Sequence, residues 1–65
     1  MMTVKEFMEK TTGVDEYAIE GKEIYTTCRP IEKEKVIEKY GERKIVSIYF
    51  YVDCYDDKCV DIEIE

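Results

Sequence analysis

The sequence has 65 residues, a formal net charge of −6 and 45% hydrophobic residues. A chain of this length forms one domain, residues 1–65, and buries only about 60% of the surface that it exposes when unfolded, which excludes a second domain and predicts a thin core. It contains no histidine, so the commonest general base and the commonest zinc ligand are missing, and we expect neither catalysis nor a cofactor nor a metal site.

No apolar stretch of the sequence approaches the roughly 20 residues that a membrane-spanning helix needs. The first ten residues, MMTVKEFMEK, contain acids where a signal peptide would be apolar. We therefore expect a cytoplasmic protein that does not bind membranes. Three cysteines make an odd number, and in a chain without an export signal this favours free thiols over disulfides.

The first predicted element is a helix over residues 3–12. Thr3 is followed three residues later by Glu6, which is the pattern of a capping box. Apolar residues then recur at helical spacing, and Gly13 is placed to end the helix.

A hairpin over residues 16–28 is predicted next. Gly21 and Lys22 can form a two-residue turn of the type that requires glycine first. This turn would place Ile19 opposite Ile24.

A second helix is predicted over residues 30–40, because Pro30 suits the first helical turn and Gly41 follows the last periodic residue. Two strands, about 43–54 and 59–65, then form a second hairpin. Both are rich in β-branched and aromatic residues, and the last alternates apolar with acidic residues.

The number of residues in the loop of the second hairpin decides which side chains share a face. An even loop would place Cys54 opposite Cys59 but would put carboxylates on half of the core face, at a cost of several kcal/mol each. An odd loop, for example 56–58, avoids this cost. Cys54 is then predicted in the core and Cys59 on the outer face beside Tyr55, so that the two thiols share neither a metal nor a disulfide. The predicted core face of this hairpin consists of Val46, Ile48, Phe50, Val52, Cys54, Val60, Ile62 and Ile64.

The turn of this hairpin contains Asp53, Asp56 and Asp57, which are oxygen ligands of the kind that calcium prefers. The segment lacks the glycine and the distal glutamate of a calcium-binding EF-hand loop. A solvated acidic turn is therefore the favoured interpretation.

The charge of the sequence is concentrated at its end. Residues 1–50 carry ten acids and nine bases, whereas residues 51–65 carry six acids and one base. The outer face of the second hairpin would interleave these acids with tyrosines, a combination that suits an arginine-rich partner. Alternatively, the tyrosines cover the sheet and the acids protect its edge from aggregation. Both interpretations remain open.

The element order is helix, strand, strand, helix, strand, strand. Short connections favour antiparallel neighbours, so we predict an α+β fold with a four-stranded, mainly antiparallel sheet and both helices on one face. The predicted contact between helices and sheet involves Phe7, Met8, Val36, Ile37, Tyr40, Ile48, Phe50, Val52 and Ile62.

The segment TVKEFMEKTTGVDEY, the following strand, the Glu/Lys helix and the terminal SIYFYVDCYDDKCVDIEIE resemble small acidic proteins carried by phages and mobile elements of Firmicutes, several anti-CRISPR proteins among them. The resemblance covers the whole chain in size and layout. It implies a compact fold whose acidic surface imitates DNA and blocks the DNA-binding site of a nuclease. The near-neutral residues 1–50 depart from the more uniformly acidic mimics.

We therefore expect a non-catalytic inhibitor that occupies the basic surface of a nucleic-acid-binding protein, such as a CRISPR nuclease, and does not itself bind nucleic acid. The predicted partner-binding residues are Tyr49, Tyr51, Asp53, Tyr55, Asp56, Asp57, Asp61, Glu63 and Glu65. The alternative is a homodimer or other homo-oligomer that pairs through a sheet face or through the edge of strand 43–54 or 59–65.

Overall fold

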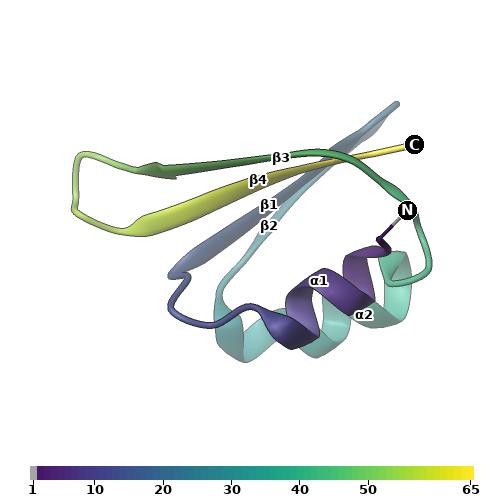
Figure 1. Cartoon of the computed structure of the whole chain (residues 1–65), viewed down its shortest axis with the longest axis horizontal. Coiled ribbons are helices and arrows are strands. Elements are labelled where there is room, and N and C mark those ends of the chain that lie inside the picture. Colours follow the sequence, from purple (N-terminus) through teal and green to yellow (C-terminus); the bar gives the residue numbers. More distant parts are fainter. Residues whose placement is uncertain (1) are drawn as a thin grey trace.

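The structure is a computed structural model that describes residues 2–65. Its elements follow the predicted order and confirm the α+β class (Figure 1). They are α1 (Val4–Lys10), β1 (Glu16–Gly21), β2 (Ile24–Cys28), the 3-10 turn η1 (Pro30–Glu32), α2 (Lys33–Tyr40), β3 (Ile45–Val52) and β4 (Lys58–Ile64).

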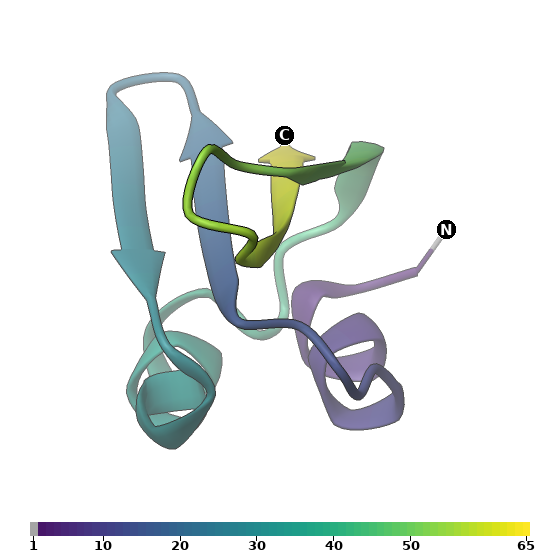
Figure 2. The same ribbon diagram turned by 90° about the vertical axis from the view of Figure 1, so that its left-hand side faces the viewer.

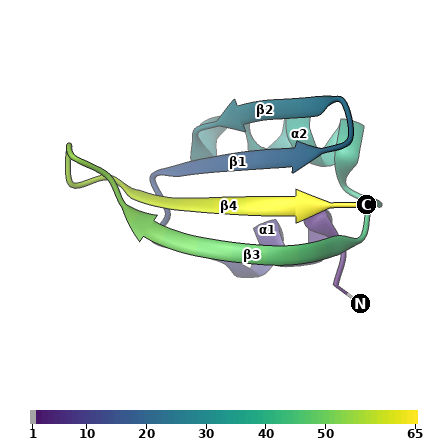
Figure 3. The ribbon, with the colours of Figure 1, turned by 90° about the horizontal axis from the view of Figure 1, so that it is seen from above.

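The four strands form one mixed sheet in the order β2-β1-β4-β3 (Figure 3). The two hairpins are antiparallel, and β1 and β4 join them as a parallel pair at the centre. Both helices lie on the same face of the sheet, as predicted (Figure 2). None of the helices within residues 2–65 is long and apolar enough to cross a membrane.

The capping box predicted at the start of α1 is present. The Thr3 hydroxyl accepts a hydrogen bond from the Glu6 backbone N–H at 3.2 Å, and the Glu6 carboxylate accepts one from the Thr3 N–H at 2.9 Å. These bonds hold the pKa of Glu6 below its usual value, because they stabilise the carboxylate. The box thus satisfies backbone donors that the first helical turn leaves free.

The helix ends at Lys10, two residues before its predicted limit. The Lys33 ammonium donates to the backbone carbonyls of Met8 (2.9 Å) and Thr11 (3.1 Å), and it lies 5.2 Å from the centre of the Tyr17 ring. A cation at this position complements the negative end of the helix dipole and connects α2 to the end of α1.

The turn of the first hairpin lies one residue later than predicted. Gly21 pairs with Ile24, and the turn consists of the two residues between them. The predicted pairing of Ile19 with Ile24 was therefore wrong. Glu23 adopts the positive φ, 62°, that the turn requires. Gly21 instead allows close packing in the sheet, because a Cβ there would lie 2.9 Å from Cγ1 of Ile64.

The helix predicted over residues 30–40 begins as the 3-10 turn η1 and continues as α2, which ends at Tyr40 as predicted. Pro30 occupies the first turn, where its missing N–H costs no hydrogen bond.

The second hairpin has an odd loop, residues 53–57. The predicted core face is confirmed for six of its eight residues, Ile48, Phe50, Val52, Val60, Ile62 and Ile64. Phe50 lies opposite Val60, and Ile48 lies opposite Ile62. The loop comes earlier than predicted, because β3 ends at Val52.

The side chain of Asp53 explains this early end. Its Oδ1 accepts hydrogen bonds from the backbone N–H groups of Tyr55 (2.8 Å) and Asp57 (3.0 Å), which closes a local turn in place of further strand pairing. Cys54 consequently lies in the exposed turn, so its predicted place in the core was wrong. Cys59 faces outward as predicted, but it is buried and lies opposite Tyr51 rather than beside Tyr55.

Residues at both ends of β3 also depart from the predicted core. A bulge between Ile45 and Ser47 buries Ile45 and leaves Val46 exposed. Phe50 and Val52 point to the helix side of the sheet but remain 60% and 62% exposed. The observed core consists of Val4, Phe7, Met8, Val14, Tyr17, Ile19, Cys28, Val36, Ile45, Val60, Ile62 and Ile64, with Ile24, Ile37, Tyr40 and Ile48 packed against it.

Candidate functional site

The face of the sheet opposite the helices is not covered by any other part of residues 2–65 (Figure 2). We call it the open face, and alternate residues of each strand form it. In the central row, Ala18 lies between Thr27 and Asp61, and Asp61 lies opposite Tyr49. The open-face residues are Glu16, Ala18, Glu20, Tyr25, Thr27, Ser47, Tyr49, Tyr51, Cys59, Asp61 and Glu63.

The open face is acidic. Glu16 and Glu20 of β1 and Asp61 and Glu63 of β4 present four carboxylates on two adjacent strands. No lysine or arginine occupies a strand position of this face within the described part of the chain. Glu20 lies directly opposite Glu63, an arrangement of like charges that weakens strand pairing. We therefore expect the repulsion between Glu20 and Glu63 to oppose folding.

Two tyrosines of β3 border the carboxylates. The rings of Tyr49 and Tyr51 are stacked, with centroids 5.7 Å apart and planes 26° apart. Burial, and next the Asp61 carboxylate, raise the pKa of Tyr51 to about 12, because both disfavour the phenolate. Tyr51 thus stays neutral near pH 7 and offers an apolar ring with a polar end, a combination that is enriched at protein interfaces.

Four of the predicted site residues are brought together on the open face: Tyr49, Tyr51, Asp61 and Glu63. The hydroxyl of Ser47 donates to the Glu63 carboxylate at 2.8 Å and orients it.

The acids of the turn are arranged differently. The Asp53 carboxylate is engaged in the local turn, and Asp57 forms an ion pair with Arg29 at 3.7 Å. Tyr55 and Asp56 are exposed in the same turn. These four residues form the end of the hairpin, next to the open face but not within its strand rows.

The structure adds two acids that the sequence did not single out, Glu16 and Glu20. Their alternation in β1 places them on one face, but only the parallel pairing of β1 with β4 brings them beside Asp61. Glu65, which was predicted, follows the end of β4, and its backbone carbonyl accepts a hydrogen bond from the Arg43 guanidinium.

No family model, curated protein or solved structure matches the chain. The resemblance to small acidic phage proteins therefore stays a prediction.

The side chains of residues 2–65 bring no three metal-ligating groups together. The three cysteines of this region are free. The contact of the Cys59 thiol with the Asp53 carboxylate, 3.8 Å between Sγ and Oδ2, instead helps to connect the turn to the open face.

Proposed function

We propose that this protein is a non-catalytic inhibitor whose open face occupies the basic, nucleic-acid-binding surface of another protein. The observation that carries the proposal is the segregation of charge: four carboxylates and three tyrosines share one sheet face that has no lysine or arginine at its strand positions within residues 2–65. Like charges gathered on one face cost stability, which a partner of opposite charge would offset.

The spacing of the carboxylates supports this partner chemistry. Side chains on neighbouring strands are about 5 Å apart, and alternate side chains along a strand are about 7 Å apart. Glu20, Asp61 and Glu63 can therefore accept charge-assisted hydrogen bonds from several arginines or lysines of one surface. Tyr49 and Tyr25, both exposed, add apolar contact area around these charges.

Binding of this kind competes with nucleic-acid phosphates for the same cations. Its strength depends on ionic strength, because salt screens exposed charge pairs. We expect the complex to weaken steeply as salt is raised, as complexes with DNA do.

The experiment compares two variants with the same change in net charge. They are E20Q/D61N/E63Q on the open face and E9Q/E34Q/E38Q on the helices, where all three glutamates are exposed. Immobilised wild type and variants first capture partners from a bacterial lysate at low salt. Each captured protein is then purified and tested for displacement of a labelled DNA duplex, which requires it to bind DNA.

We expect wild type and the helix variant to displace the duplex from a captured DNA-binding protein, and the open-face variant to need at least about tenfold more protein, since 1.4 kcal/mol of lost contacts suffices for that change. Equal displacement by both variants, or a binding constant that does not change with salt, would refute the proposal. Failure of the wild type to capture any DNA-binding protein would favour a solubility role for the acids.

A further inference from the structure

The β3 edge of the sheet is unprotected. β3 is an edge strand, and its eight residues, Ile45–Val52, include no charged residue, proline or glycine. On the outer side of β3, the N–H of Ile45 donates to the Met2 carbonyl at 2.9 Å. No strand within residues 2–65 pairs with the rest of this outer side. Proteins usually protect such an edge with charges, proline or a covering segment, because its free amides and carbonyls recruit another strand.

The side chains of β3 are unusually exposed for their type. Val46, Tyr49, Phe50 and Val52 are each more than half exposed. They make up half of the exposed large hydrophobic residues of the described chain, and Tyr25 is the only one on β2, the other edge strand. The apolar surface of the molecule is thus concentrated on β3.

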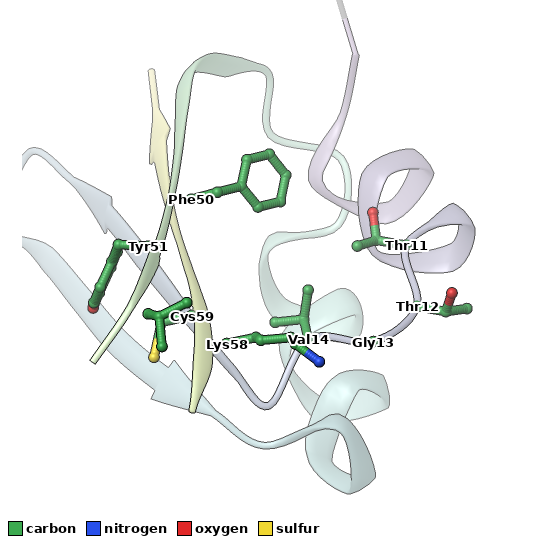
Figure 4. A pocket seen from close by; sticks show the side chains of 9 residues that line it. Thr11, Thr12, Gly13, Val14, Phe50, Tyr51, Lys58 and Cys59 are labelled. Atoms are coloured by element: carbon green, nitrogen blue, oxygen red, sulfur yellow. The ribbon is translucent and has the colours of Figure 1, made fainter. Parts of the chain in front are cut away.

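A groove adjoins β3 on the helix side of the sheet. It has a volume of about 380 Å³ and lies between residues 11–14 and the end of the β3–β4 hairpin (Figure 4). Phe50 points toward α1, whereas Tyr51 points to the opposite side, as Figure 4 shows. Val14 and Val52 also line the groove, so apolar surface continues from the strand to the loop beside it.

We infer that β3 pairs with β3 of a second copy, antiparallel, to form a dimer with a continuous eight-stranded sheet. An apolar edge suits a strand that is itself uncharged and exposes apolar side chains. β2 and β3 both lack charges, but β3 carries four of the exposed large hydrophobic residues and β2 only one, so a second β3 is the better match. Each copy carries a net charge of −6, and β3 is a surface where two copies meet without placing like charges directly opposite each other. Antiparallel pairing of a strand with itself is isologous and closes after two copies.

The pairing has a definite geometry. In a register centred on Tyr49, Ile48 of one copy lies opposite Phe50 of the other on the helix side, and Tyr51 lies opposite Ser47 on the open side. The apolar side chains that each monomer exposes thereby cover one another. A two-fold axis that pairs these edges must be perpendicular to the sheet, so both open faces lie on the same side. The dimer presents one acidic face of twice the width.

The test measures mass against concentration by light scattering and sedimentation equilibrium. It compares wild type with V46K/V52K on β3 and with Y25K/I31K, which replaces two exposed hydrophobic residues outside β3 and makes the same change in charge. All four side chains are more than half exposed, so the substitutions remove little core packing. Circular dichroism verifies that each variant is folded.

We expect the measured mass of wild type and of Y25K/I31K to rise with protein concentration toward twice the monomer mass of 7.8 kDa. The mass of V46K/V52K should stay that of the monomer. A wild type that is monomeric at every concentration, a dimeric V46K/V52K, or a mass that keeps rising beyond the dimer would each overturn the inference. If V46K/V52K does not fold, hydrogen exchange of the wild-type β3 amides tests the dimer instead. Pairing should slow the exchange of these amides as protein concentration rises, and exchange rates that do not depend on concentration would overturn the inference. E20Q/D61N/E63Q should remain dimeric, so loss of partner binding and loss of the dimer are distinguishable.

Discussion

Burial separates the three thiols of the chain. Cys28 and Cys59 are 4% exposed, whereas Cys54 is exposed in the turn after β3. Burial raises the pKa of both Cys28 and Cys59, and nearby carboxylates, Glu32 at the first and Asp53 at the second, act in the same direction. The thiolate is the reactive form of cysteine. Both buried thiols are therefore protected from modification, because burial keeps reagents away and the raised pKa keeps the thiols protonated.

This environment predicts the order of thiol modification. With iodoacetamide at pH 8, Cys54 should react at least about tenfold faster than the other two thiols, since reactivity follows thiolate fraction and exposure. Mass spectrometry should detect one adduct on the folded protein and three in denaturant. Cys54→Ser serves as the control and should remove the fast reaction. Two adducts forming at equal rates on the folded wild type would contradict the assignment.

Glycine has different roles in different elements, and β1 provides the clearest case. Gly21 does not form the turn of the first hairpin; its missing side chain leaves room for Ile64 of β4. Glu23, two residues later in the turn, carries the positive φ of 62° instead. A side chain at Gly21 must displace Ile64, whereas a glycine at position 23 would relieve backbone strain.

Two opposite effects on stability follow. Gly21→Ala should lower the free energy of unfolding by about 1–3 kcal/mol, the usual cost of overpacking. Glu23→Gly should be neutral or should raise the free energy of unfolding by up to about 1 kcal/mol, because a non-glycine residue at positive φ carries strain. Urea unfolding followed by circular dichroism measures both. A Glu23→Gly variant that is destabilised as much as Gly21→Ala would indicate that the turn lies at residues 21–22.

The sequence predicted those elements that local chemistry determines. The capping box of Thr3 begins α1, and the cost of burying carboxylates identified the correct faces of the second hairpin. The apolar alternation of β3 continues into Cys54, so it did not reveal that the Asp53 side chain closes a turn there, and the resulting exposure of Cys54 was missed. The bulge that exposes Val46 was missed for a similar reason, since the apolar alternation continues through it.

The candidate site was only partly predictable because it depends on long-range pairing. Tyr49, Asp61 and Glu63 share a hairpin, and its alternation placed them together. Glu16 and Glu20 join them through the parallel contact of β1 with β4, two strands that β2, η1, α2 and β3 separate along the chain. No residue pattern specifies that contact, since it follows from how the two hairpins pack side by side.

At the scale of the whole molecule, charge is distributed by layer. α1 contains two acids and two bases, and α2 contains two acids and three bases, so the helix layer is close to neutral. The open face carries the carboxylates of β1 and β4. This asymmetry gives the molecule an electric dipole. The negative potential of the open face would turn that face toward a basic surface as the two proteins approach each other.

The same asymmetry predicts that the acidic face is maintained at a cost in stability. Glu20→Gln removes the repulsion from Glu63, which lies directly opposite on β4, and should raise the free energy of unfolding by about 0.2–1 kcal/mol. Salt screens this repulsion, so added salt should stabilise wild type more than the variant. Glu9→Gln on α1, a helix with balanced charge, is the control and should not produce this gain. Urea midpoints at low and high salt measure both effects. If Glu20→Gln stabilises the fold while weakening capture of a basic partner, the acids serve binding; a variant that is less stable at low salt would instead show that the carboxylate supports the sheet.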